Sequence, residues 1–174
     1  MAVEERKCNC TPRESCKLAN RCLEKNMVYQ ANVNIIDKAP RQLQERAQPE
    51  NQGSKTPKIE YYVGLYSTTG KERLGNHYKA FIHRRYIMDT ALSQFIWELK
   101  DKGLDYEIEW VLLAKASPYN PSNKTCNLCS KERFFILRKH WMATINKYNS
   151  LSSKCIHRRL TIYWSIFSLE IKNT

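Results

Sequence analysis

The chain has 174 residues, enough for one domain with a buried core, and its 29 Lys and Arg against 17 Asp and Glu give a formal net charge of +12. No apolar run approaches the roughly 20 residues of a membrane span, and 4 Trp, 10 Tyr and 5 Phe exclude a disordered tail. The positive charge favours an anionic partner, above all nucleic acid, over charge that serves solubility alone.

Residues 1–26 are polar and hold four cysteines, with the spacing Cys8-x-Cys10-x5-Cys16-x5-Cys22. The first residues lack an apolar stretch, so we expect no secretory signal and an intracellular protein. In a reducing compartment, clustered thiols are more often zinc ligands than disulfides. We therefore expect a zinc-stapled module here; buried or free thiols and a disulfide framework are the alternatives.

Two strands follow, separated by a polar insertion. The β-branched residues of 27–36 and 59–66 predict strands, whereas 37–58 is rich in Gln, Pro, Glu and Lys and predicts a solvated loop. Residues 67–70 form a predicted turn that also suits the N-cap of a helix.

Two helices and a third strand come next. Residues 71–84 predict a basic helix, and Asp89-Thr90 is expected to cap a helix whose apolar residues recur with helical spacing up to Leu99. Gly103 is expected to end that helix. Residues 105–114 alternate acidic and apolar side chains, with Tyr106, Ile108 and Trp110 on one face, and predict a half-buried strand.

The C-terminal part holds a second group of potential zinc ligands. After a loop over 117–124, helices are predicted over 129–142 and 144–152, and an apolar tail begins at residue 160. The second group is Cys126-x2-Cys129 with Cys155-x-His157. We thus expect a cysteine-rich module (1–26), an α/β domain (27–159) with the insertion 37–58, and a tail (160–174). The predicted α/β domain has a three-stranded sheet.

Six polar residues spread over the middle of the chain have ordinary structural explanations when taken singly. Strand tyrosines are usually core residues, helical arginines are usually solvated, and a lone histidine is more often structural than catalytic. Arg73 and His77 are four residues apart and therefore share a helix face. The full set is Tyr29, Tyr62, Arg73, His77, Glu132 and Asn146.

Together these residues resemble the GIY-YIG endonuclease domain of the type found in Penelope-like retroelements. The matching motifs are Met27-Val28-Tyr29, Tyr62-Val63-Gly64, Arg73-Leu74-Gly75-Asn76-His77, Glu132 in the stretch 129–136, and Asn146 in 144–147. The retroelement type is indicated by Cys8-Asn9-Cys10, residues 91–102, Ala116-Ser117-Pro118-Tyr119 and Cys126-Asn127-Leu128-Cys129. The resemblance covers about residues 8 to 157. It implies a mainly antiparallel sheet flanked by helices.

The resemblance also implies a mechanism, the nicking of DNA by phosphodiester hydrolysis. One divalent metal, Mg²⁺, would be held by Glu132, and Arg73 would grip the scissile phosphate. Tyr29 would help take the proton from water, assisted by His77 or Tyr62, provided that Arg73 or the metal lowers its high pKa. His77 is expected to be neutral, and Asn146 would orient the glutamate or a phosphate.

One departure is that Tyr29 and Tyr62 are 33 positions apart, more than the family usually has. The extra residues lie in the insertion 37–58, and a surface loop between strands tolerates added length at small entropic cost. The active site is therefore expected to survive it.

Basic side chains on or just past the predicted helix 71–84 would neutralise DNA phosphates without reading sequence: Lys71, Lys79, Arg84 and Arg85. Specificity would come from the cysteine modules or from a reverse transcriptase of the parent element, and we expect a nuclear location. Two alternatives stay open: a zinc-dependent nucleic-acid-binding module without activity, and a basic scaffold that binds another protein.

Overall fold

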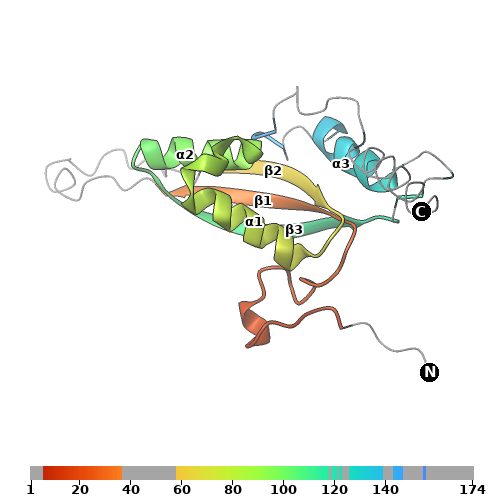
Figure 1. The fold of residues 1–174 in the computed structure, drawn as a ribbon. Coiled ribbons are helices and arrows are strands. Elements are labelled where there is room, and N and C mark those ends of the chain that lie inside the picture. Colours follow the sequence, from red (N-terminus) through yellow and green to blue (C-terminus); the bar gives the residue numbers. More distant parts are fainter. Residues whose placement is uncertain are drawn as a thin grey trace, which may run out of the picture.

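A three-stranded antiparallel sheet forms the centre of the molecule, with strand order β2-β1-β3 (Figure 1). The computed structural model describes residues 6–36, 58–117, 119–120, 122, 126–138, 143–146 and 155. The strands are β1 (Met27–Ile36), β2 (Lys58–Tyr66) and β3 (Asp105–Lys115). The sheet and its strands confirm the fold class predicted from the sequence.

The register of the sheet decides which side chains share a face. Across β1, Tyr29 pairs with Gly64 of β2 and with Leu112 of β3, and Ala31 pairs with Tyr62 and Trp110. Directly paired residues lie on the same side of a sheet. Tyr29, Tyr62 and Trp110, one from each strand, therefore lie on one face, the aromatic face.

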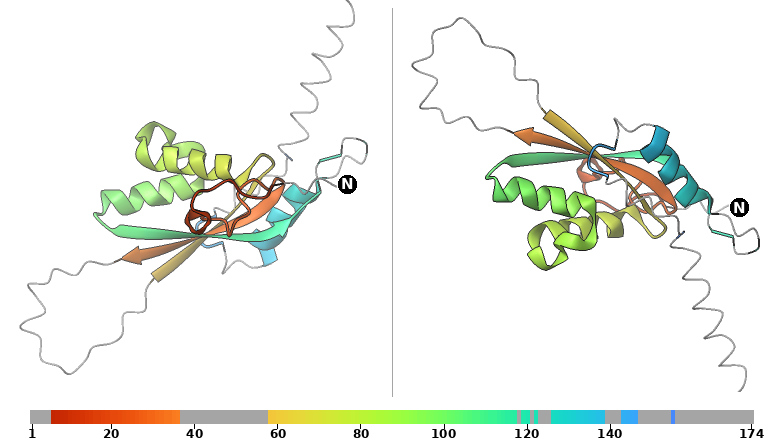
Figure 2. Two further views of the ribbon diagram at one scale, coloured as in Figure 1. Left: turned by 90° about the horizontal axis from the view of Figure 1, so that it is seen from below. Right: turned by 90° about the horizontal axis from the view of Figure 1, so that it is seen from above.

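Helices cover both faces of the sheet (Figure 2). On the aromatic face lie α1 (Gly70–Ile82) and α2 (Ala91–Asp101), joined by the short 3-10 helix η3 (Arg84–Asp89). The helix α3 (Asn127–Arg138) packs on the opposite face, against Val28 and Val63.

The helix ends follow the capping signals of the sequence. The Thr69 hydroxyl accepts the N–H of Glu72 at the start of α1, and Thr90 and Ser93 form a reciprocal capping box at the start of α2. Gly103 follows α2 with a φ of +67°, a conformation that favours glycine.

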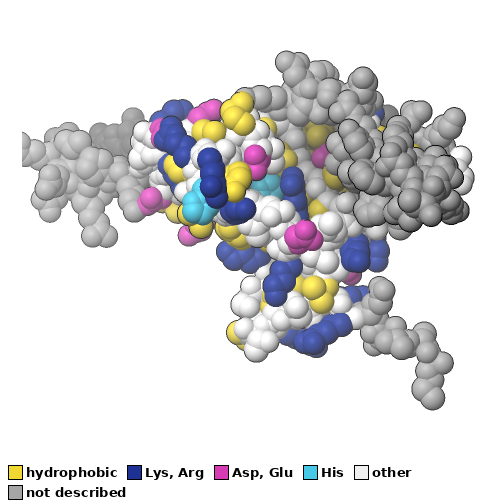
Figure 3. Space-filling model, viewed as in Figure 1, with side chains coloured by type: hydrophobic (Ala, Val, Ile, Leu, Met, Phe, Trp, Pro, Cys, Tyr) yellow, Lys and Arg dark blue, Asp and Glu magenta, His cyan; other side chains and the backbone are white. Residues whose placement is uncertain are grey.

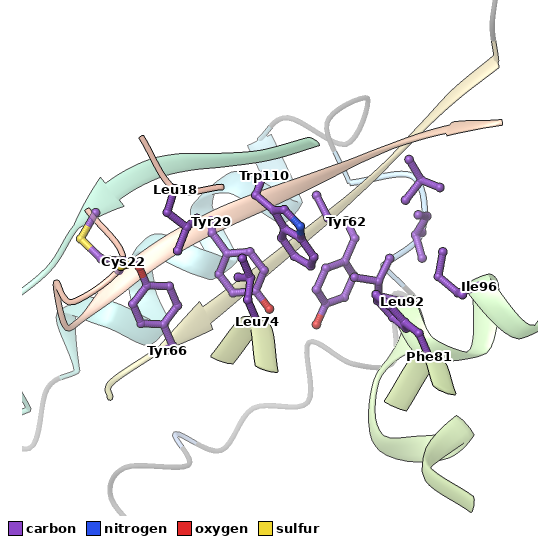
Figure 4. Packing of buried hydrophobic residues seen from close by; sticks show 14 of the residues in the cluster. Leu18, Cys22, Tyr29, Tyr62, Tyr66, Leu74, Phe81, Leu92, Ile96 and Trp110 are labelled. Carbon is purple, nitrogen blue, oxygen red and sulfur yellow. The ribbon is translucent and has the colours of Figure 1, made fainter. Parts of the chain in front are cut away.

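The main core lies between the aromatic face and α1 and α2. Figure 4 shows Tyr29, Tyr62 and Trp110 projecting from the strands toward Phe81 of α1 and Leu92 and Ile96 of α2. The cysteine-rich segment, which contains the 3-10 turn η1 (Arg13–Ser15), adds Leu18 to this same core. The module is therefore packed directly on the domain.

Residues 143–146 cover the outer edge of β2, and this corrects one prediction. The backbone N–H of Ile145 donates to Tyr61 at 2.8 Å, and the Thr144 hydroxyl accepts the Tyr61 N–H at 2.8 Å. Residues 144–146 thus form a turn bonded to a strand edge and do not begin the predicted helix 144–152, whose later residues lie outside the described part. Pairing of the edge explains the difference, because strand backbone groups need partners.

No helix among the described residues is long and apolar enough to cross a bilayer.

Candidate active site and metal centres

Three of the predicted residues form a buried hydrogen-bonded chain. The Tyr29 hydroxyl lies 2.6 Å from Nε2 of His77 and accepts a hydrogen bond from Nε of Arg73 at 3.1 Å. Arginine only donates, so the phenol oxygen accepts from Arg73 and its own proton is free to go to His77. The chain joins β1 to one face of α1, as the four-residue spacing of Arg73 and His77 predicted.

His77 is held neutral by its surroundings. Burial, together with the charge of Arg73, lowers the pKa of His77 to about 3. Its ring is 2% exposed and lies against Trp110 and Phe81, with centroid distances of 5.4 and 5.9 Å. The neutral form agrees with the sequence-based expectation.

Neither tyrosine has the lowered pKa that Tyr29 would need in order to take a proton from water. Burial raises the pKa of Tyr29 well above its usual value, and the opposing charge of Arg73 does not compensate. Burial also raises the pKa of Tyr62. Tyr29 is 0% exposed and Tyr62 is 7% exposed, so only Tyr62 touches the surface at all. Without a bound metal, neither phenol is poised to ionise.

Gly64 makes room for the two phenols. A Cβ atom at this position would lie 2.6 Å from the Tyr29 hydroxyl oxygen and 2.9 Å from Cε1 of Tyr62. A glycine inside a strand often marks such a close approach. A glycine therefore suits this position of the Tyr62-Val63-Gly64 motif, because the Tyr29 ring of the neighbouring strand occupies the space that a side chain would need.

Glu132 of α3 is the acidic residue among those predicted for the site. Its side chain is half-buried; burial raises the pKa of Glu132 to about 7, while the charges of Arg73 and Arg133 oppose the shift. The carboxylate also raises the pKa values of Tyr29 and Tyr62. The charge of Arg73 thus influences the pKa of Glu132, although α3 packs on the face of the sheet opposite α1.

Asn146 serves the strand that carries Tyr62. Its amide oxygen accepts the Val63 N–H and its amide nitrogen donates to the Val63 carbonyl, both at 2.8 Å. This bidentate pairing extends the edge of β2. The structure therefore places Asn146 as a support of the strand beside Gly64, a contact that differs from the predicted one to glutamate or phosphate.

The first cysteine group has the geometry of a tetrahedral thiolate site. The sulfurs of Cys8, Cys10, Cys16 and Cys22 all lie within 4.8 Å of one another. Sγ of Cys22 lies 3.6 Å from that of Cys8 and 3.7 Å from that of Cys10. Sulfurs bound to zinc at about 2.3 Å are separated by roughly 3.8 Å in a tetrahedron, whereas a disulfide needs about 2.05 Å. The distances fit structural zinc.

The environment of these sulfurs favours the thiolate at Cys16 and the neutral thiol at Cys10. The backbone N–H of Cys10 lies 3.4 Å from Sγ of Cys8. Burial opposes ionisation of Cys16, yet the N–H groups of Leu18 and Asn20 lower its pKa to about 7. The hydrogen bond with Cys22, followed by burial, raises the pKa of Cys10 to about 12. Several thiolates this close require a metal to ionise together.

The second group brings together three of its four predicted ligands. Cys126, Cys129 and Cys155 lie with their sulfurs within 4.8 Å of one another, and those of Cys129 and Cys155 are 3.6 Å apart. His157, the fourth predicted ligand, lies outside the described residues. Because Cys126 precedes α3 and Cys129 lies in its first turn, a metal here would fix the start of the helix that carries Glu132.

The four predicted phosphate-binding residues are all exposed but differ in their surroundings. Arg84 makes a bidentate salt bridge with Asp101 at 2.8 and 2.9 Å. Lys79 and Arg85 lie against the Tyr86 ring, 4.8 and 4.7 Å from its centroid. Lys71 donates to Asn9 of the cysteine-rich segment at 3.1 Å. Figure 3 shows dark blue side chains over the helices and over that segment.

One further residue of the site, Trp110, had no assigned role in the sequence-based interpretation. Trp110 packs on both His77 and Tyr29, with ring centroids 5.4 and 5.8 Å apart, and its indole N–H donates to the Tyr78 hydroxyl at 3.1 Å. Its inward position on a predicted strand was a usable signal. The sequence held no signal for the pairing of Thr144 with Tyr61, because this pairing depends on a tertiary contact.

Comparison of the chain with protein families, with curated proteins and with solved structures finds no match.

Proposed function

We propose that this chain is a metal-dependent DNA endonuclease that nicks one strand by hydrolysis and resembles the GIY-YIG nucleases of Penelope-like retroelements. One observation carries the proposal. The buried Tyr29 hydroxyl is bonded both to the guanidinium of Arg73 and to the neutral ring of His77, and the charge of Arg73 influences the pKa of Glu132 in α3. Groups of this kind, with pKa values shifted by burial, are typical of catalytic sites.

The donor set near Glu132 fits Mg²⁺. A single half-buried carboxylate leaves most coordination positions to water and phosphate oxygens, which is how Mg²⁺ commonly binds when it acts on phosphates. When bound, the metal would polarise the phosphate and favour ionisation of a water. Glu132 would hold it, and the DNA phosphate would supply further negative charge.

Arg73 would bind the scissile phosphate. Its Nε donates to Tyr29 and its guanidinium also bonds to Tyr62, which fixes the side chain and its planar fork. The attack of water on phosphorus breaks the bond to the 3′ oxygen and places more negative charge on the phosphate oxygens. A fixed guanidinium stabilises that charge without reorganisation.

The Tyr62 hydroxyl would carry the proton away. Tyr62 is the phenol nearest the surface and interacts with Tyr29 and Arg73. The proton that the attacking water loses would pass through the Tyr62 hydroxyl to the departing 3′ oxygen, so that no group of the protein stays protonated. Neutral His77 accepts the Tyr29 hydroxyl at Nε2 and holds Tyr29 beside Arg73 and Tyr62.

The test is nicking of supercoiled plasmid by zinc-loaded protein with Mg²⁺. We expect Glu132→Gln to reduce nicking at least about 100-fold, since it removes the predicted metal ligand, and to leave DNA affinity nearly unchanged. Glu72→Gln, at an exposed site in α1, is the matched control and should nick normally. If the folded wild-type protein binds DNA but does not nick with any of several divalent metals, the inactive zinc-dependent binding module is the correct function.

A further inference from the structure

The hydroxyl of Tyr66 is buried and has no hydrogen-bond partner among the described residues. Tyr66 ends β2 and is only 3% exposed. Its oxygen is closely packed, because a Cβ atom on Gly70, the first residue of α1, would lie 2.7 Å from it. A buried polar group without a partner costs free energy, so this hydroxyl needs an explanation.

The Tyr66 hydroxyl points toward the first cysteine group. Figure 4 shows the hydroxyl end of its ring directed at Cys22, one of the four clustered cysteines. The backbone agrees with this view, because the Cys22 carbonyl accepts the N–H of Lys71, the residue after Gly70, at 2.8 Å. Tyr66 and Cys22 also belong to one buried cluster. The unpartnered oxygen therefore lies beside a potential metal ligand.

Tyr66 is able to donate a hydrogen bond to this ligand. A phenol keeps its proton at neutral pH, and burial, followed by the charge of Glu24 and more weakly that of Cys22, raises the pKa of Tyr66 further. The two Glu24 oxygens already accept hydrogen bonds from Arg21, at 3.0 and 2.8 Å. The Cys22 sulfur is a weak acceptor as a thiol, whereas a metal-bound thiolate carries negative charge and accepts a much stronger hydrogen bond.

We propose that Tyr66 is a positioning residue of the first metal centre, whose hydroxyl donates a hydrogen bond to the Cys22 thiolate when zinc is bound. The four sulfurs fit a tetrahedral thiolate site, and hydrogen bonds to the ligands are a regular part of such sites. The metal turns Cys22 into the acceptor that the buried hydroxyl lacks. The Tyr66 ring packs on that of Tyr29, with centroids 5.7 Å apart, so this bond would connect the metal centre to Tyr29.

The first experiment measures zinc affinity by competition with a chelator of known affinity. Tyr66→Phe removes only the hydroxyl and should weaken the binding of one zinc equivalent about tenfold, as expected for the loss of a group that supports a ligand. The matched control is Tyr106→Phe, which removes the same group from a half-buried tyrosine at the opposite end of the sheet. Its zinc affinity should stay within about twofold of the wild-type value.

Two further measurements separate this hydrogen bond from a role in folding. With cobalt in place of zinc, Tyr66→Phe should shift the sulfur-to-metal charge-transfer absorption to longer wavelength, because a thiolate that loses a hydrogen bond gives up an electron more easily. In chelator, without metal, Tyr66→Phe should be at least as stable to urea as the wild type, because the lost hydroxyl had no partner.

Three results would overturn the proposal. They are equal zinc affinities of Tyr66→Phe and the wild type, an unchanged cobalt spectrum, and a loss of stability in Tyr66→Phe that is as large without metal as with it. A wild-type protein that binds no metal would overturn it as well. The inference depends on metal at the first cysteine group and not on DNA cleavage, so failure of the nicking assay would leave it standing.

Discussion

Replacement of Gly64 by alanine tests whether the two phenols fill the space above this residue. The new Cβ would lie 2.6 Å from the hydroxyl oxygen of Tyr29, 2.7 Å from its Cζ and 2.9 Å from Cε1 of Tyr62. Carbon atoms in contact normally stay about 3.5–4.0 Å apart, so the rings must move by about 1 Å. Tyr29 is 0% exposed, and its ring is surrounded by those of Tyr66, His77 and Trp110, which leaves it no free direction.

Overpacking of this kind costs about 1–3 kcal/mol of unfolding free energy, and we expect Gly64→Ala to lose that amount in urea unfolding. The same shift would lengthen the bonds from Tyr29 to His77 and Arg73, so nicking should fall by more than the unfolded fraction explains. The matched control is Gly75→Ala in α1. Its Cβ would meet nothing within 4 Å, and alanine there should stabilise the helix by up to about 1 kcal/mol. Equal stability of Gly64→Ala and the wild type would refute the packing argument.

Three further predictions follow from the same geometry. The pKa of His77 drops from 6.5 in the unfolded chain to about 3 on folding, so the free energy of unfolding should fall as pH decreases below about 6.5, by at most about 5 kcal/mol. Measured by urea unfolding between pH 7 and pH 5, this free energy should depend less on pH in His77→Gln than in the wild type. The same pH dependence in both proteins would contradict the assignment. Metal analysis of purified protein should find zinc, and Cys22→Ser should lower both the zinc content and the melting temperature. A protein that contains no zinc, and whose melting temperature is the same with and without a chelator, would contradict the site. Arg73→Ala should reduce the nicking rate far more than Lys79→Ala, which should mainly lower the salt slope by about one; equal rate effects would exclude a special role for Arg73.

The elements with strong local signals could be predicted from the sequence. The strands over 27–36 and 105–114 show β-branched or alternating patterns, and the starts of α1 and α2 depend on Thr69 and Thr90, whose hydroxyls bind nearby backbone groups. The helix starting near residue 71 ends at Ile82, earlier than predicted, because the chain turns at His83 into η3. That turn depends on packing between α1 and α2.

The chemistry of the site could be predicted only in part. The spacing of Arg73 and His77 placed them on one face, and the family resemblance selected Tyr29 as their neighbour. The burial of Tyr29, which raises its pKa, depends on rings from β2, β3 and α1 and could not be read from any one motif. The contacts of Asn146 likewise depend on which groups at the edge of β2 need partners.

The two cysteine groups lie where a small sheet most needs support. The carbonyl of Cys22 accepts the N–H of Lys71 in the first turn of α1, two residues before Arg73. Cys129 lies in the first turn of α3, three residues before Glu132. The two charges come from helices on opposite faces of the sheet, so no single core layer fixes their separation. Metal-bound cysteines beside the starts of both helices would limit the movement of each helix against the sheet. They would thereby keep the distance between the Arg73 guanidinium and the Glu132 carboxylate constant, and the proposed hydrolysis depends on that distance.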